Sequence, residues 1–275
     1  MAGARNDPDR KLFAEELRAI RKQRGLTRDQ LGAMINYSGS SIGNIEAMMR
    51  APTRVMAKWL DEALDLPGTL QRMEERIRGV PFSAGFRPFY PYEAEARVLR
   101  WFEHSLVPGL FQTEDYARAL FSTFPGATPE DIEGRVTGRM GRQSILHRNE
   151  PPPPHIWTVL DEQVLHRNVG GPKVMVTQTE HLLKLAQMPR NTIQVLSWDR
   201  PNLGLRGAFV VAELAEPPAI VYLENASDGE TIEDAEMAEE MTLKFDGLRT
   251  EALTGSASLT MIEEAIQRWQ ERTGA

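Results

Sequence analysis

Residues 12–49 read LFAEELRAIRKQRGLTRDQLGAMINYSGSSIGNIEAMM and contain three short helical patterns separated by two polar turns. In the first pattern, Phe13, Leu17 and Ile20 recur at the spacing that places side chains on one buried stripe of a helix. Gly25 follows, and glycine commonly ends a helix. The segment therefore predicts a helix that closes just before a second one begins.

Two hydroxyl residues predict where the next helices start. Thr27 precedes Gln30 at the spacing of a capping box, in which the hydroxyl caps the amide three residues on and the glutamine reaches back. Ser38 follows a polar turn and is the expected N-cap of the third helix. The apolar positions of these two helices are Leu31, Ile35, Ile42 and Ile45. This order of helix, helix, short turn and polar-fronted helix is typical of a helix-turn-helix.

The third helix is predicted to read DNA. In a helix-turn-helix, the second helix of the pair lies in the major groove and the helix before it crosses the phosphate backbone. The predicted DNA-binding residues are Thr27, Arg28, Gln30, Ser38, Ser40, Ser41, Asn44 and Arg50. Ser40, Ser41 and Asn44 are expected at base edges, and Asn44 is the best candidate because its amide can pair bidentately with adenine. Because serines discriminate weakly, we expect a homodimer on operator half-sites about one helical turn apart.

The same residues resemble the xenobiotic-response-element type of bacterial repressor. The shared pattern is Leu26-Thr27, Gln30, Leu31, Ser38, Ile42 and Ile45-Glu46. Two glycines depart from it, since Gly32 stands where an alanine usually packs the two helices and Gly39 where a long polar side chain often opens the recognition helix. The alternative is an ordinary helical bundle without a DNA role, which would require the capping and the spacing to coincide by chance.

Charge is unevenly distributed along the 275 residues, whose net charge is −7. Residues 1–80 hold 14 Lys and Arg against 11 Asp and Glu, a balance of +3, so the rest of the chain holds 18 against 28, a balance of −10. Phosphate binding needs a locally basic surface, whatever the sum over the chain. The small excess predicts a modest affinity for DNA that falls steeply with salt.

The composition argues against several function classes. The chain has no cysteine, so disulfide scaffolds, thiolate zinc sites and cysteine nucleophiles are excluded, and its five histidines lack the spacing that places two of them on one metal ion. Gly170-Gly171-Pro172-Lys173 lacks the ending of a phosphate-binding loop, and Asp161-Glu162 is better explained as a helix start than as an acid-base pair. We expect no enzyme activity, no cofactor and no metal. No apolar run approaches the length of a membrane span, which predicts a cytoplasmic protein without a membrane partner.

The pattern changes along the chain and predicts a fold that is mixed and mainly α. Residues 1–79 are predicted as a five-helix, lambda-repressor-like DNA-binding head, because further amphipathic patterns follow the third helix. Residues 80–92 are rich in proline and aromatic residues and are predicted as a linker without regular structure, packed against the body. Residues 93–275 are predicted as an α+β body for regulation, dimerisation or partner binding.

The expected body combines a small sheet with covering helices. Residues 93–149 are predicted to be helical, with breaks near 107–109 and 126–129. Short β-rich runs follow at 155–160, 192–198, 207–214 and 219–223. Helices are expected at 177–188, at about 231–251 and at 257–271.

Four segments of the body, residues 107–117, 139–143, 161–167 and 221–224, carry motifs such as VPGLFQTEDYA and DEQVLHR. They resemble the body of a large family of actinobacterial regulators, typified by WhiJ-like proteins and described as antitoxin-like. In that family this type of head is joined to this type of body, and a small protein encoded nearby is thought to act on the regulator. The resemblance implies a transcriptional regulator controlled by a small neighbour-encoded partner.

One alternative is a protein-interaction module, an antitoxin or adaptor in which DNA binding is secondary. Arg135, Arg139 and Arg142 recur on one helical face that could meet an acidic partner, and the acidic run within 230–240 could meet a basic one. Ordinary solvated faces are the simpler interpretation of both features.

Another alternative is a repressor that senses a small molecule. The aromatic residues that could line a pocket are Trp101, Phe102, Trp157 and Trp198. Core packing is the simpler interpretation of each of them. The sequence does not choose between a protein effector and a small-molecule effector.

Overall fold

The computed structural model describes residues 8–79, 85–199, 207–225 and 229–274. The chain forms two compact units, a head unit of residues 1–85 and a body unit of residues 86–275. Each unit buries an apolar core of its own. Within the described ranges, no helix is both long enough and apolar enough to cross a bilayer.

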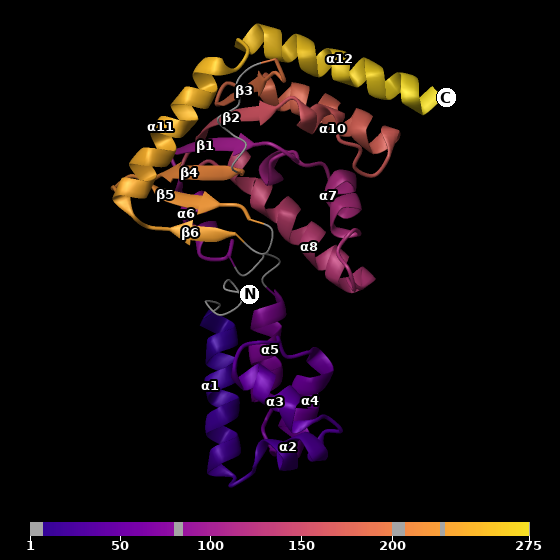
Figure 1. Cartoon of the computed structure of the whole chain (residues 1–275), viewed down its shortest axis with the longest axis vertical. Coiled ribbons are helices and arrows are strands. Elements are labelled where there is room, and N and C mark those ends of the chain that lie inside the picture. The colour runs from indigo at the N-terminus through magenta and orange to yellow at the C-terminus, as the bar shows by residue number, and fades with distance from the viewer. Residues whose placement is uncertain (1–7, 80–84, 200–206, 226–228, 275) are drawn as a thin grey trace. The chain divides into compact units, whose positions relative to one another are not determined.

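Residues 8–79 form five helices, which confirms the predicted all-helical head (Figure 1). They are α1 Pro8–Gln23, α2 Arg28–Met34, α3 Gly39–Glu46, α4 Arg54–Ala63 and α5 Thr69–Gly79. The core contains the apolar positions predicted for the first three, namely Phe13, Leu17, Ile20, Leu31, Ile35, Ile42 and Ile45. The apolar period of the sequence therefore places the inward face of each helix correctly.

Side chains cap the starts of three head helices. Thr27 Oγ1 accepts the Gln30 N–H at 3.1 Å, and Gln30 Oε1 accepts the Thr27 N–H at 2.8 Å, which completes the predicted capping box of α2. Ser38 Oγ accepts the Ser41 N–H at 3.2 Å at the start of α3. Thr53 caps α4 in the same way. These caps satisfy amides that have no partner within the helix, and they fix where α2 and α3 begin.

The body unit is built on a mixed sheet with the strand order β3-β2-β1-β4-β5-β6. The strands are β1 Val98–Glu103, β2 His155–Asp161, β3 Asn191–Leu196, β4 Phe209–Glu213, β5 Ile220–Leu223 and β6 Glu230–Ile232. β1, β2 and β3 run parallel, whereas β4, β5 and β6 continue the sheet from β1 in antiparallel pairs. The sheet thus changes from parallel to antiparallel at β1.

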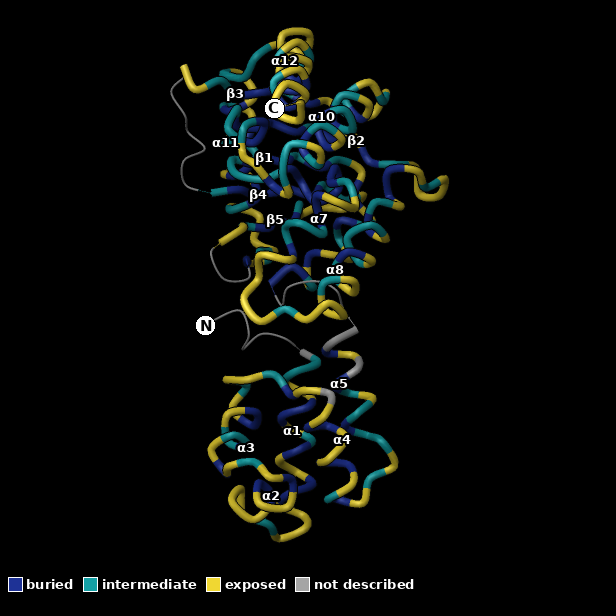
Figure 2. Tube along the Cα trace, turned by 90° about the vertical axis from the view of Figure 1, so that its right-hand side faces the viewer, coloured by how far each residue is buried: buried dark blue, intermediate teal, exposed yellow. Residues whose placement is uncertain are grey.

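Helices lie on both sides of this sheet (Figure 1). α11, Ala235–Glu251, packs the buried side chains Ala238, Met241, Phe245 and Leu248 against one face. The other described helical segments are α6 Phe89–Glu95, η2 Gly109–Phe111, α7 Glu114–Phe121, α8 Pro129–Arg142, η3 Gln143–Leu146, α9 Gln163–His166, α10 Pro172–Ala186 and α12 Gly255–Gly274. α12 packs along α10 and β3. Buried residues concentrate in the strands between these layers (Figure 2).

Two predictions for the body are wrong. Residues 98–103 form the central strand β1 instead of a helix. Leu99, Trp101 and Phe102 are buried on both faces of the sheet, so the strand lacks the polar alternation that marks a half-exposed strand. The helix predicted from residue 231 begins at Ala235, because residues 230–232 pair with β5 and Asp234 caps α11.

The predicted linker, residues 80–92, is partly helical. Residues 80–84 lie outside the described residues, but α6 begins at Phe89, which corrects the expectation of no regular structure. Phe89 is fully buried, and the Phe86 ring lies 5.0 Å from the Tyr222 ring of β5, centroid to centroid. The aromatic residues of this segment therefore pack into the body unit.

Candidate nucleic-acid interface

The two glycines that depart from the usual repressor pattern lie at close backbone contacts between α2 and the segment that begins α3. A Cβ added to Gly32 would lie 2.6 Å from the Tyr37 carbonyl oxygen, and one added to Gly39 would lie 2.9 Å from the Asp29 backbone nitrogen. Real Cβ atoms do not come so close to backbone atoms, so neither position has room for a side chain. The glycines therefore set the distance between the two helices.

A buried carboxylate joins three helices behind this motif. The Glu46 side chain, at the end of α3, is 0% exposed. Its Oε1 accepts the Arg21 Nε–H of α1 at 2.6 Å, and its Oε2 accepts the Arg28 Nε–H of α2 at 2.8 Å. Arg18 donates to the Glu46 carbonyl oxygen at 2.6 Å. We call Arg18, Arg21, Arg28 and Glu46 the Glu46 cluster.

The arginines of the Glu46 cluster keep this carboxylate charged. Burial alone would raise the pKa of Glu46, but the hydrogen bonds and charges of Arg21 and Arg28 outweigh burial and lower it. The cluster locks α3 against α1 and α2 through charge-assisted hydrogen bonds. Sequence reasoning missed this role, although an acidic side chain directly after the buried Ile45 of an amphipathic helix is the signal that could have found it.

The predicted base-reading side chains lie together on α3. Ser40 and Asn44 are exposed and four residues apart, so they share one helical face, and Ser41 is half-buried beside them. The Ser38 hydroxyl oxygen lies 2.8 Å from that of Ser40 and 2.9 Å from that of Ser41. The Asn44 side-chain amide belongs to an exposed residue. This amide has both the donor and the acceptor needed for an adenine edge.

The residues predicted to touch phosphate lie at the start of α2 and after α3. Thr27, Gln30 and Arg50 are exposed, and the carbonyl oxygen of the Gln30 side chain is taken by the α2 cap. The Arg28 side chain is 49% exposed, with its Nε–H donated to Glu46. Arg28 thus combines a structural role in the Glu46 cluster with an accessible guanidinium.

Each of the two units matches a known protein family. Residues 12–73 match a helix-turn-helix domain, and residues 86–264 match the family described as "Domain of unknown function (DUF5753)". The chain belongs to the DUF5753 family. No curated protein and no solved structure matches it. The DUF5753 match begins at residue 86, the first residue of the body unit, and the helix-turn-helix match points to a DNA-binding regulator.

The arginine-bearing face of α8 in the DUF5753 body is not the solvated surface that the sequence suggests. Arg142 is 5% exposed, and its Nε lies 2.7 Å from Oε2 of the buried Glu93 on α6. Arg139 donates to Gln112 Oε1 at 2.8 Å. Arg135, whose guanidinium lies 5.1 Å from the Phe124 ring centroid, is half-buried, as is Arg139. These arginines hold segments of the DUF5753 fold together.

Acidic residues end two of the three parallel strands of the DUF5753 body. Glu103 ends β1 and is 4% exposed, and burial, together with the nearby Glu224 carboxylate, raises the pKa of Glu103 well above its usual range. Asp161 ends β2, and its Oδ1 accepts the Gln163 N–H at 3.0 Å at the start of α9, in keeping with a helix-start role. Across the described ranges, no three His, Asp or Glu side chains converge to hold a metal ion.

The aromatic residues considered as pocket-forming have different positions in the DUF5753 body. Trp101 and Phe102 are buried in the sheet, and Trp198 is 58% exposed after β3. Trp157 of β2 lines a pocket on the α11 side of the sheet. The four residues therefore do not form one aromatic site.

Proposed function

We propose that this protein is a transcriptional regulator that recognises a specific operator in double-stranded DNA, as a homodimer, with α3 in the major groove. The observation that carries the proposal is the exposed polar face of α3, which holds Ser40 and Asn44 and is backed by the buried Glu46 carboxylate and its arginine partners. Such backing fixes the orientation of a reading helix, and a fixed orientation is what base-edge hydrogen bonds require.

The proposed contacts divide by chemistry. Ser40, Ser41 and Asn44 face base edges, and Ser38 closes the start of α3 beside them. The proposed phosphate contacts are the exposed residues Thr27, Arg28, Gln30 and Arg50. This division predicts that α3 substitutions alter sequence preference and that Arg50 substitutions alter the salt dependence of binding.

The test is a binding titration at fixed salt against DNA fragments selected from a random pool by the full-length protein. Asn44→Ala is expected to weaken binding to the selected sequence by about 5- to 150-fold, the range of one bidentate base contact, and to relax the preference at one base position. Gln267→Ala removes an exposed amide from α12 of the body unit and serves as the control. Equal affinity and equal preference for Asn44→Ala and Gln267→Ala would contradict the proposal.

We further propose that the regulator is antitoxin-like and controlled by a small basic protein encoded nearby. The resemblance of the body to antitoxin-like actinobacterial regulators supports this, and so does the exposed acidic side of α11, formed by Glu236, Glu239 and Glu240. Co-expression with the neighbour-encoded protein is expected to yield a complex with altered operator affinity. Separate elution of the two proteins at low salt would count against partner control while leaving DNA recognition intact.

A further inference from the structure

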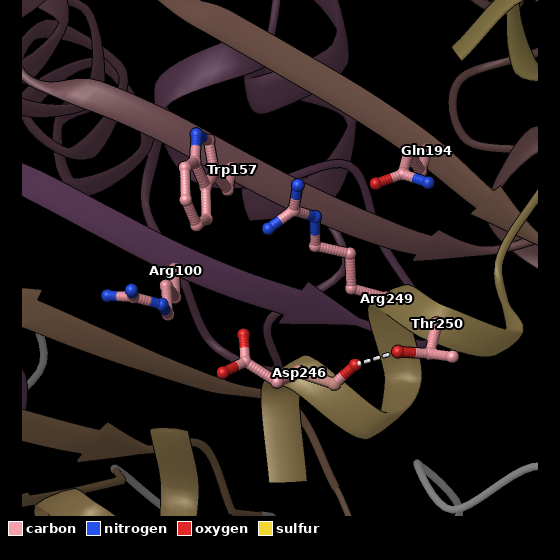
Figure 3. A pocket seen from close by; sticks show the side chains of 6 residues that line it. All are labelled: Arg100, Trp157, Gln194, Asp246, Arg249 and Thr250. Atoms are coloured by element: carbon pink, nitrogen blue, oxygen red, sulfur yellow. Dashed lines mark hydrogen bonds between the residues drawn. The ribbon is translucent and has the colours of Figure 1, made fainter. Parts of the chain in front are cut away.

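A pocket of about 510 Å³ opens on the α11 side of the sheet in the body unit (Figure 3). Its lining residues are Arg100, Trp157 and Gln194 from β1, β2 and β3, and Asp246, Arg249 and Thr250 from α11. The volume falls within the range of small-molecule sites, about 300–1,000 Å³. The pocket therefore has the size of a ligand site and draws on four separate elements.

The fold brings these side chains to one place. Arg100 and Trp157 are direct partners in the β1–β2 register, and Gln194 pairs with Val159, two residues along β2, so all three side chains share one face of the sheet. Asp246, Arg249 and Thr250 recur at i, i+3 and i+4 on α11. The Asp246 carboxylate and the Arg249 guanidinium are directed from the helix toward the strand side chains (Figure 3).

Two cations converge on one indole ring at this pocket. The guanidinium carbon of Arg100 lies 5.1 Å from the Trp157 ring centroid, and that of Arg249 lies 4.3 Å from it. Burial lowers the pKa of Arg100, the Asp246 carboxylate opposes this change, and the charge of Arg249 lowers the pKa further. The two guanidiniums are thus close enough to repel each other, and an anion between them would relieve that repulsion.

The hydrogen-bonding capacity of the pocket is incomplete. The Arg100 side chain is 13% exposed, and its Nη1 pairs with Glu213. The Arg100 Nε is buried without a hydrogen-bond acceptor anywhere in the described part of the chain. An unsatisfied buried donor is costly, so the fold supplies the Arg100 guanidinium with fewer acceptors than it can use.

Hydrogen-bond acceptors also line the pocket, beside the two arginines. Gln194 donates its amide N–H to the Leu253 carbonyl oxygen at 2.8 Å, which orients its own carbonyl oxygen as a free acceptor group for a ligand. The Thr250 hydroxyl donates to the Asp246 carbonyl oxygen at 2.8 Å, so toward a ligand it also acts as an acceptor. With the Asp246 carboxylate, the pocket presents acceptors beside the paired cations, and it therefore suits a ligand that has both an oxyanion and N–H or O–H donors.

We propose that this pocket binds a small organic acid, whose carboxylate or phosphate group sits between Arg100 and Arg249 and whose N–H or O–H donors meet Asp246 and Gln194. The planar guanidinium fork matches both oxyanions in bidentate geometry. Asp246 disfavours a second negative charge at the same end of the ligand. The site lies wholly within the body unit, so ligand binding is measurable without DNA and does not depend on the proposed operator recognition.

The experiment is isothermal titration of the full-length protein with three probes: salicylate for a carboxylate, adenosine monophosphate for a phosphate, and inorganic phosphate for the bare oxyanion. Saturable 1:1 binding of salicylate or the nucleotide, tighter than about 10 mM, is expected, and the better probe identifies the oxyanion. Arg249→Ala, which removes an exposed guanidinium, is expected to weaken that binding at least about tenfold.

The matched control is Arg272→Ala, which removes another exposed arginine over a tryptophan, 4.8 Å from the Trp269 ring centroid and outside the pocket. It is expected to leave binding unchanged. Circular dichroism melting confirms that both variants are folded. The proposal is overturned if no probe binds more tightly than about 10 mM, or if the binding survives Arg249→Ala undiminished.

Discussion

Glu46 illustrates how one buried residue can organise a surface that it does not reach. Its carboxylate receives hydrogen bonds from Arg21 of α1 and Arg28 of α2, while Asn44 projects outward from the same helix. Breaking a buried ion pair leaves a charge without its partner, which costs far more than losing a surface pair. The stability of the whole head unit therefore depends on this residue.

Glu46→Gln is expected to destabilise the head unit by about 3–5 kcal/mol at neutral pH, because the buried Arg21 loses its counter-charge. The ion pairs lower the pKa of Glu46 in the folded state. Their stabilisation is therefore complete above the unfolded pKa of about 4.3 and is lost as the pH falls through the lower folded pKa. Below about pH 4.5 the stability of the native protein should fall more steeply than that of Glu46→Gln.

Amide hydrogen exchange of α1, α2 and α3, corrected for intrinsic rates, measures this loss within the full chain. The control is Glu62→Gln, which removes a carboxylate that is 61% exposed and lies 3.8 Å from Lys58. Its effect should stay below about 1 kcal/mol. Matching pH profiles for the two variants would show that the Glu46 cluster does not stabilise the head unit.

The glycines of α2 and α3 should tolerate a side chain to different degrees. Gly32→Ala and Gly39→Ala are expected to lower the free energy of unfolding by about 1–3 kcal/mol, because each Cβ would meet backbone atoms at 2.6 or 2.9 Å. Gly43→Ala in α3 should instead raise it by about 0.5–1 kcal/mol, since its Cβ would meet Arg28 at an ordinary 3.6 Å. Urea unfolding followed by circular dichroism measures the three variants, and a stable Gly39→Ala protein would refute the steric argument.

Helix caps could be predicted from the sequence, whereas long-range ion pairs could not. Thr27, Gln30 and Ser38 were predictable as caps because a cap depends on neighbours within three residues. The Glu46 cluster joins positions 25 and 18 residues apart, and the Arg142–Glu93 pair joins positions 49 apart. Pairings at such separations depend on the completed packing, so a periodic pattern assigns these side chains to a solvated face.

At the level of helices, four of the head helices end in the same way. The second residue after each end has a left-handed backbone, with φ of 66° at Gly25, 57° at Asn36, 58° at Met48 and 51° at Asp65. The following amide then bonds back to the last turn, as the Leu66 N–H does to the Asp61 carbonyl oxygen at 2.8 Å. Only one of these four positions is a glycine, so the other three carry a conformational cost.

This shared helix end predicts opposite effects for two substitutions. Gly25→Ala should destabilise the head unit by about 1 kcal/mol through the backbone alone, because its Cβ would have no neighbour within 4 Å. Asp65→Gly should stabilise it by about 1 kcal/mol, since it relieves the left-handed strain and removes an acid from the negative end of α4. Thermal unfolding of both variants measures these effects. Effects of the same sign would show that the left-handed backbone at these helix ends does not determine stability.

The central strand β1 could not be predicted from the sequence. β1 reads VLRWFE and lies between β2 and β4, with helices on both sides of the sheet. A strand buried on both faces has no polar alternation, and six residues are too few to separate strand from helix by period. β2 was predictable because its β-branched and aromatic run follows the prolines at 151–154.

At the level of the whole molecule, the two units carry opposite charge. The head unit holds the same +3 as residues 1–80, because residues 81–85 are uncharged, and the body unit holds −10. The sequence predicted this division because charge and period are properties of contiguous segments. It did not predict the Arg100–Trp157–Arg249 pocket, which combines residues from three strands and a helix up to 150 positions apart.

The proposed reading of a few bases by a weakly basic head requires two copies of the chain on DNA. The proposed reading face of α3 offers the exposed Ser40 and Asn44 and the half-buried Ser41, and each base contact discriminates by only about 1–3 kcal/mol. Light scattering of the complex with a selected operator is therefore expected to give two chains per fragment, on half-sites about 34 Å apart. Deleting one half-site should weaken binding at least about tenfold at fixed salt. One chain per fragment, with affinity unaffected by the deletion, would instead mean that α3 and its flanking arginines recognise the operator as a monomer.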